Sequence, residues 1–198
     1  MRFRGRTLIE GPGVREAWHR GRRDYYVLVL RIGGGDDPAA EVLARRAAVW
    51  GALAPWLLPA SPEDPHVTAW VYGFGRPPPH PAEGARVRVR IGGADSFASC
   101  AFLKASVAGA EGIRRGAEAV AAGPEERWAP WVPHLTVGRY GAEVGAREVA
   151  ARLRGLRWLP GLEAEARLVT CALDPADPSG GLWDLYPEAG CTSTTSRC

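Results

Sequence analysis

The sequence has little of several features that mark particular protein classes. No apolar run approaches the roughly 20 residues that a bilayer-spanning helix needs, and no apolar stretch follows the charged N-terminus as it would in a secretory signal. The four cysteines include no CxxC pair, so neither a disulfide framework nor a structural zinc site is expected. These absences argue against a membrane protein and leave the cytoplasm as the expected location.

The cysteines occur in two settings. Cys100 and Cys171 lie in apolar, strand-like stretches, and we interpret them as small core residues. Cys191 and Cys198 enclose a Ser/Thr-rich segment with no packing pattern. Residues 188–198 are therefore predicted to form a flexible C-terminal tail.

Lysine is nearly absent, since Lys104 is the only lysine among 25 basic residues. We attribute this bias to GC-rich codons. The formal charge of +3 is unevenly placed, because residues 1–24 carry seven arginines against three acidic residues. Residues 1–24 are thus predicted to form a basic N-terminal arm. The arm either contacts nucleic-acid phosphates or is a solvated extension.

The remaining composition is that of a globular domain. Hydrophobic residues make up 46% and charged residues 24% of 198 positions, enough for one domain or two small lobes that share a core. Periodicity and Gly/Pro punctuation predict interleaved strands and helices. Strands are expected at 25–32, 67–74, 86–91, 99–107, 132–140, 164–173 and 181–186, and helices at 39–53, 113–122 and 147–153. A strand–helix–strand order occurs twice, which indicates two similar lobes within one domain at 25–187.

Two of the four histidines occur in matching tetrapeptides, PHVT with His66 and Thr68, and PHLT with His134 and Thr136. Side chains alternate along a strand, so the histidine and threonine of each motif share one face. They lie roughly 6.6 Å apart along the strand and can face one phosphate together. Two such matches, both with threonine and both preceded by proline, are far less expected by chance than one.

Two histidines suit the hydrolysis of a phosphodiester without a metal or other cofactor. In-line displacement at phosphorus places the attacking and leaving oxygens on opposite sides. One group must therefore take a proton while another gives one. Imidazole, with an ordinary pKa of about 6.5, can do either near neutral pH. The threonine hydroxyls can donate hydrogen bonds to the non-bridging oxygens.

These motifs, 68 positions apart in a chain of this size, resemble those of the two-histidine phosphoesterase superfamily. The nearest branch is the bacterial 2'-5' RNA ligase-like proteins, which act as RNA 2',3'-cyclic phosphodiesterases. The resemblance covers most of residues 25–186, but only the two motifs are specific. It implies an α+β fold in which two similar lobes with antiparallel sheets flank a central groove, with helices outside. It also implies that His66 is the general acid for the departing 3' oxygen, that His134 is the base that activates water, and that the product ends in a 2'-phosphate.

Arg139 follows the second motif, three residues after Thr136, as an arginine often does in that branch, where it helps to hold phosphate. In an ideal strand its side chain points to the face opposite Thr136. A bulge or bend is therefore needed if Arg139 is to bind the substrate.

The first motif continues AWVYGF, where the branch usually has a leucine-rich run ending in FLG. This departure bears on substrate identity more than on reaction type. Trp70, Tyr72 and Phe74 all lie on the face of the motif residues. Trp70 and Phe74 are candidates to stack a base, and core packing is the expected role of at least two of the three.

The remaining candidates have simpler interpretations. His19 and His80 are expected to be exposed and inert, and no carboxylate is spaced to complete a zinc site with the two motif histidines. A basic strand face is either a solvated edge or a track for RNA. It consists of Arg86, Arg88 and Arg90.

The sequence therefore predicts a monomeric, cytoplasmic cyclic phosphodiesterase that acts on RNA ends or on a cyclic nucleotide. Two alternatives stay open. The same catalytic pair could serve a 2'-5' phosphodiesterase or an RNA-end ligase. The second alternative is a non-catalytic RNA-binding protein, although binding alone would not need both histidines.

Overall fold

The structure is a computed structural model that describes residues 6–7, 19, 21–33, 37–58, 65–125, 130–176 and 181–186. The predicted C-terminal tail, with Cys191 and Cys198, lies outside these residues, as does most of the predicted N-terminal arm.

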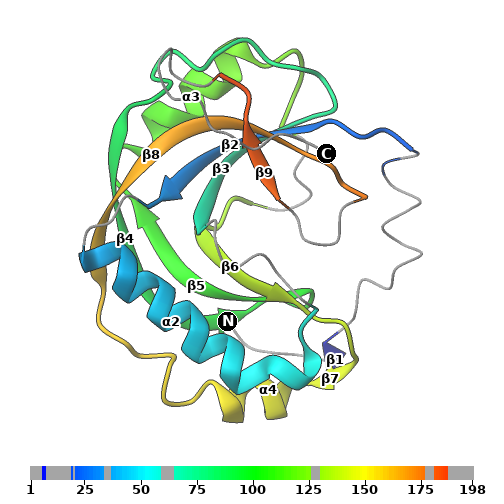
Figure 1. Ribbon diagram of the computed structural model, residues 1–198, viewed down its shortest axis with the longest axis vertical. Coiled ribbons are helices and arrows are strands. Elements are labelled where there is room, and N and C mark those ends of the chain that lie inside the picture. Colours follow the sequence, from blue (N-terminus) through cyan, green and yellow to red (C-terminus); the bar gives the residue numbers. More distant parts are fainter. Residues whose placement is uncertain are drawn as a thin grey trace, which may run out of the picture.

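Seven of the described strands form one antiparallel sheet. They are β2 (Tyr25–Ile32), β3 (His66–Gly73), β4 (Arg86–Ser96), β5 (Cys100–Val107), β6 (His134–Arg139), β8 (Leu162–Leu173) and β9 (Leu182–Asp184). Their order is β2-β3-β6-β5-β4-β8-β9, and β2 also pairs with β8. The first six of these strands therefore close into a barrel-like ring (Figure 1).

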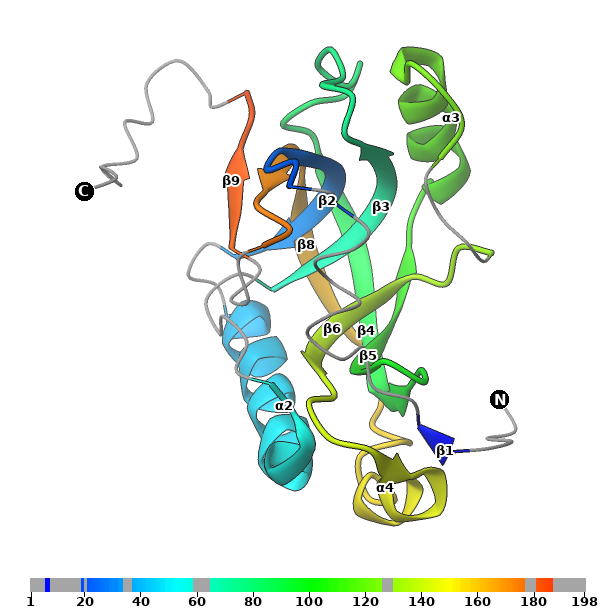
Figure 2. The ribbon, with the colours of Figure 1, turned by 90° about the vertical axis from the view of Figure 1, so that its right-hand side faces the viewer.

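Three described α-helices accompany the ring: α2 (Asp37–Leu53), α3 (Ala110–Val120) and α4 (Ala146–Arg152). Pro55 lies in a short 3-10 turn, η1 (Ala54–Trp56), directly after α2, as expected of a residue that cannot continue a helix. In Figure 1 α3 lies at one end of the ring, and α2 and α4 lie at the other. Figure 2 shows that α2 and α3 lie on opposite sides of the strands. Among the described residues, no helix combines the length and apolarity needed to span a membrane.

The predicted mixed α+β class and the predicted elements are confirmed, with shifts at their ends. The expected division into two lobes with separate sheets is not what the register shows. Because β8 is 12 residues long, its second half pairs with β2 and its first half with β4, which joins the strands into one sheet. A groove between two lobes is not shown by the described residues.

A small second sheet was not predicted. β1 (Arg6–Thr7) pairs with β7 (Val144–Gly145). At this point the N-terminal arm is hydrogen-bonded to the domain. Strands of two residues carry no periodic signal, which is why the sequence did not reveal them.

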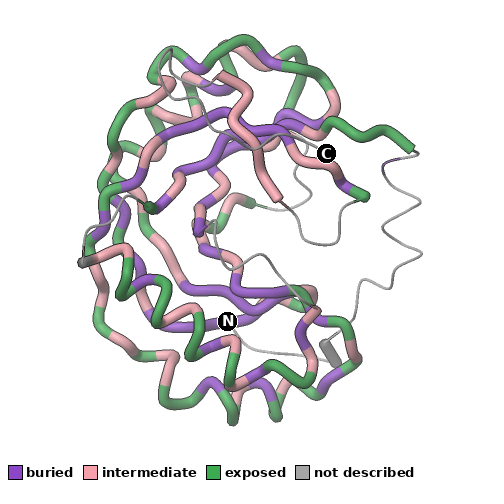
Figure 3. Tube along the Cα trace, in the orientation of Figure 1, coloured by how far each residue is buried: buried purple, intermediate pink, exposed green. Residues whose placement is uncertain are grey.

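The hydrophobic core takes side chains from one face of every strand in the ring and from α2, α3 and α4. We call this the core face of the sheet and the opposite side the motif face. Figure 3 shows that buried positions concentrate along the strands. A smaller apolar cluster, which includes Val29 and Val169, lies on the motif face of β2 and β8. Cys100 and Cys171 are buried free thiols, as predicted.

The expectation that His19 and His80 are exposed is wrong, since their relative exposures are 6% and 4%. His80 Nε2 donates to the Ile113 carbonyl at 3.0 Å, and Nδ1 accepts from the Ala82 N–H at 3.0 Å. The proline-rich loop at 76–81 thus packs its histidine under α3. The absence of a side chain at Gly116 leaves the space for that ring.

The basic strand face on β4 lies inside the sheet, between β5 and β8, and not at an edge. Arg86 pairs with Glu165 at 2.5 Å, and Arg90 lies 3.8 Å from Glu163. These side chains are more than half exposed, so they form a solvated face on which each charge has an opposite charge across the strands.

Candidate active site

The two motif strands, β3 and β6, are neighbours in the ring and run antiparallel. The residues that pair across them are Val67 and Leu135, both fully buried on the core face. Opposed residues in an antiparallel pair point to the same side, and side chains alternate along each strand. The residues on either side of Val67 and Leu135 therefore point to the motif face.

On the motif face, this register sets each histidine across from the threonine of the other motif. Continued by one residue in each direction, it places His66 opposite Thr136 and Thr68 opposite His134. All four are half-buried. The two histidines then form a diagonal pair, and such neighbours are typically about 7–8 Å apart, with their β-carbons somewhat closer. One phosphate placed over these four side chains could contact both imidazoles.

A proline carbonyl fixes the start of each motif strand. The Ile32 N–H donates to the Pro65 carbonyl at 2.8 Å, and the Ala105 N–H donates to the Pro133 carbonyl at 3.1 Å. Proline has no N–H to donate, so each strand begins at the histidine that follows. The same local device therefore places both histidines at the first position of their strands.

One hydrogen bond and two aromatic contacts help to hold the His134 ring. Nδ1 lies 2.7 Å from the Val132 carbonyl, and the rings of Phe97 and Phe102 meet the imidazole in edge contacts at 4.9 and 5.3 Å. A carbonyl oxygen only accepts hydrogen bonds, so Nδ1 carries the proton. In the neutral ring Nε2 then has the lone pair, which a general base requires.

Each histidine has a basic residue beside it on the next strand. Arg31 on β2 pairs in register with His66, and Lys104 on β5 pairs with His134. Arg31 is also ion-paired with Asp184, which brings β9 to this side of the site. Neither cation could be assigned to the site from the sequence, because only the strand register brings them there. Lys104 stood out only as the single lysine.

A cluster around Arg114 fastens α3 to the first motif strand. Arg114 donates to the Ala69 carbonyl at 2.8 Å, and its guanidinium lies 5.0 Å from the Trp70 ring and 4.9 Å from the Trp131 ring. Trp131 in turn donates to the Thr68 carbonyl at 2.9 Å. These contacts hold the backbone of the first motif against the segment that leads into the second.

The expectation that the aromatic residues after the first motif share the face of His66 and Thr68 is wrong for Trp70 and Tyr72. The register between β2 and β3 slips by one residue between Thr68 and Trp70, and such a bulge reverses the alternation of side chains. Trp70 and Tyr72 are 6% and 9% exposed and belong to the core, which confirms core packing for two of the three. Phe74, just after β3, is half-buried and contacts the Tyr25 ring at 5.0 Å, with the Arg22 guanidinium 3.6 Å from its ring centroid. Trp70 therefore offers little surface to a base, and Phe74 offers more.

Arg139 lies on the same face as Thr136. The register between β5 and β6 slips by one residue just after Thr136, which makes Val137 an extra residue in β6. Such a bulge reverses the alternation, so the exposed Arg139 side chain joins the motif face. Gly138 is needed here because a β-carbon would approach the Trp50 ring to 2.8 Å. The bulge that the sequence required for Arg139 is present.

Directly after this bulge, Tyr140 fastens the end of β6 to β4. Its hydroxyl lies 2.7 Å from that of Ser96 in the core. Burial raises the pKa of Tyr140, so the phenol stays neutral and able to donate.

Within the described part of the chain, no three His, Cys, Asp or Glu side chains lie close enough together to hold a metal ion.

No protein-family model and no curated protein matches the chain. Its fold is similar to that in the crystal structure of TT0787 of Thermus thermophilus, with a TM-score of 0.51. The match has 21% sequence identity and covers 74% of this chain and 87% of that chain. At this identity the likeness concerns the fold.

Proposed function

We propose that the protein is a metal-independent phosphodiesterase of the two-histidine superfamily that hydrolyses 2',3'-cyclic phosphates, at RNA ends or on nucleotides. The observation that carries the proposal is the pairing of Val67 with Leu135, because it directs both motifs to one face of the sheet. A diagonal pair of imidazoles meets the need of in-line displacement for one proton acceptor and one proton donor.

In the proposed reaction, a water oxygen attacks phosphorus on the side opposite the 3' oxygen. His134 Nε2 takes a proton from that water as the new P–O bond forms. The bond between phosphorus and the 3' oxygen breaks, and His66 gives its proton to the departing oxygen. The products are a 2'-phosphomonoester and a free 3'-hydroxyl, and solvent exchange then restores both imidazoles. The protonated Nδ1 of His134 supports its assignment as the base.

The non-bridging oxygens carry the charge that builds during the reaction. We assign Thr68 and Thr136 as their hydrogen-bond donors and Arg139 as a further phosphate contact. Arg31 and Lys104 add positive potential beside the histidines.

The other candidate contacts are those that would bind a base. Phe74 is the residue that we propose to stack against the base of the substrate. Trp70 was a candidate for the same role, but its burial beside Arg114 favours packing.

A turnover screen tests the proposal. The substrates are 2',3'-cyclic mononucleotides, an RNA oligonucleotide that ends in a cyclic phosphate, and 2'-5' linked dinucleotides. We expect hydrolysis of one or both cyclic phosphates, with 2'-phosphate products. Cleavage of the 2'-5' dinucleotides alone would instead show a 2'-5' phosphodiesterase. Joining of RNA ends would show a ligase, and tight RNA binding without turnover would show a binding protein.

A further inference from the structure

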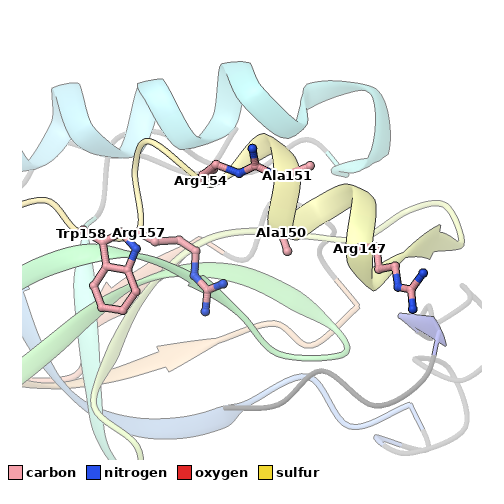
Figure 4. A pocket seen from close by; sticks show the side chains of 6 residues that line it. All are labelled: Arg147, Ala150, Ala151, Arg154, Arg157 and Trp158. Atoms are coloured by element: carbon pink, nitrogen blue, oxygen red, sulfur yellow. The ribbon is translucent and has the colours of Figure 1, made fainter.

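A basic pocket lies beside α4 and the turn that follows it. It has a volume of about 420 Å³, and the described residues of its wall are arginine, alanine and tryptophan, none of them acidic. The lining residues are Arg147, Ala150, Ala151, Arg154, Arg157 and Trp158. In Figure 4, Arg157 and Trp158 lie side by side beyond one end of α4, and Arg147 lies at the other end.

Trp158 is 80% exposed, far more than the other exposed large hydrophobic residues of the described chain. Two cations approach its ring: Lys104 Nζ lies 5.3 Å and the Arg157 guanidinium 6.0 Å from the ring centroid. Core packing does not account for an indole that is mostly in water. An exposed aromatic face flanked by cations is typical of surfaces on which nucleic-acid bases stack.

The positive charge of the pocket is only partly neutralised. Asp95 is the shared acidic partner of two cations, 3.5 Å from Lys104 and 3.8 Å from Arg157. Arg147 and Arg154 are exposed and form no ion pair with any residue that the structure describes. Both guanidiniums are thus available to the phosphates of a bound chain.

Lys104 links this pocket to the proposed active site. It pairs in register with His134 across β5 and β6, and its ammonium reaches the Trp158 ring. The pocket therefore begins one side chain away from the proposed catalytic base. A nucleotide chain whose end reacts at the histidines could reach it within a few nucleotides.

We propose that this pocket binds the nucleotides that precede the reacting end of a single-stranded RNA. A base stacks on Trp158, and backbone phosphates contact Arg154 and Arg147. The inference rests on the proposed function and deepens it, because it assigns an RNA end, and not a free cyclic nucleotide, as the substrate class. An acidic protein partner would also be attracted by the charge, but it would not need the bare indole face.

The test is the affinity of the full-length protein for a short labelled single-stranded RNA that ends in a 2'-phosphate, measured by fluorescence anisotropy. Trp158→Ala should weaken binding by about fivefold to a hundredfold, the usual loss when a stacked base loses its aromatic partner. Arg154→Glu should also weaken binding and reduce its dependence on salt. The matched control is Arg115→Glu on α3, an exposed arginine at the other end of the ring (Figure 1).

Arg115→Glu should change the affinity much less than Arg154→Glu. Equal losses in these two variants would show attraction to net charge alone and would overturn the proposal. An RNA affinity that is unchanged in Trp158→Ala would also overturn the proposal. This holds even if the pocket binds an acidic protein.

Steady-state turnover separates this inference from the proposed function. Trp158→Ala should raise KM for the cyclic-phosphate-ended RNA and leave hydrolysis of a cyclic mononucleotide unchanged. If wild-type protein hydrolyses neither substrate but Trp158→Ala still loses RNA affinity, the pocket stands and the proposed function fails. If turnover of the RNA is the same with and without the indole, the pocket fails and the proposed function stands.

Discussion

Val67 on β3 and Leu135 on β6 lie opposite each other, both fully buried, at the point where the two motif strands join. The proposed chemistry depends on this apolar pair, although neither residue touches the substrate. Their side chains occupy the core face and so direct the flanking polar residues to the other side of the sheet. A shift of one residue in either strand would turn its histidine into the core.

Removal of either histidine should abolish most of the turnover. We expect His66→Ala and His134→Ala each to lower kcat by about two to four orders of magnitude, the usual worth of general acid–base catalysis. The double variant should lose much less than the product of the single losses, because both residues act in one step. Thr68→Ala and Thr136→Ala should cost less, about tenfold to a thousandfold, as donors to a developing charge.

The measurement is steady-state turnover of a 2',3'-cyclic nucleotide across pH, with urea unfolding as the control for folding. Wild-type kcat/KM should rise and then fall with pH. The apparent pKa values of both limbs should belong to His66 and His134 as a coupled pair. A single limb that persists in both variants would contradict acid–base catalysis by two histidines.

A substrate with an unusually good leaving group should separate the roles of the two histidines. Such a group hardly needs a proton, so the loss in His66→Ala should largely disappear while that in His134→Ala remains. The measurement compares both variants on an activated aryl phosphodiester and on the cyclic nucleotide. Rescue of His134→Ala alone would reverse the assignment, and rescue of neither would indicate another mechanism.

Activity should be unchanged in excess chelator, because both proton transfers are assigned to imidazoles. The check is turnover before and after dialysis against a chelator, with zinc and manganese added back. Loss on dialysis followed by recovery with either metal would refute the metal-independent mechanism.

Two glycines of α3 should respond in opposite ways to alanine. A β-carbon at Gly112 would meet no atom within 4 Å, so Gly112→Ala should stabilise the fold by about 0.5–1 kcal/mol. A β-carbon at Gly116 would approach His80 Nε2 to 2.5 Å, and His80 is fixed by two hydrogen bonds. Gly116→Ala should therefore destabilise the fold by about 1–3 kcal/mol.

Urea unfolding of Gly112→Ala and Gly116→Ala measures both changes in stability. Midpoints that shift in the same direction would show that His80 is not packed under α3. The two substitutions are matched because both replace a glycine in the same helix, so differences in helix propensity cancel.

The helices and strands, and the face on which each motif side chain lies, could be predicted from patterns of neighbouring residues. Alternating or β-branched runs marked the strands, and the two-residue period was enough to put each histidine on the same face as its threonine. The need for a bulge before Arg139 could also be stated from the sequence, because strand geometry alone required it. Each of these inferences uses neighbours within one element.

Non-local packing could not be predicted in the same way. Arg31 and Lys104 come beside the histidines only through strand register, which no local pattern encodes. The burial of His80 could not be predicted, because a proline-rich loop is usually exposed, whereas the loop that holds His80 packs under α3. The exposure of Trp158 could not be predicted, because this residue lies in a turn without periodicity, where exposure depends on the whole fold.

The most direct test of the account is phosphorus NMR of a 2',3'-cyclic nucleotide incubated with the protein in excess chelator. The cyclic resonance should convert to that of a 2'-phosphate with wild-type protein and should persist with His66→Ala and His134→Ala over the same interval. Persistence of the cyclic resonance with wild-type protein, or equal conversion by the two variants, would contradict catalysis by the paired motifs.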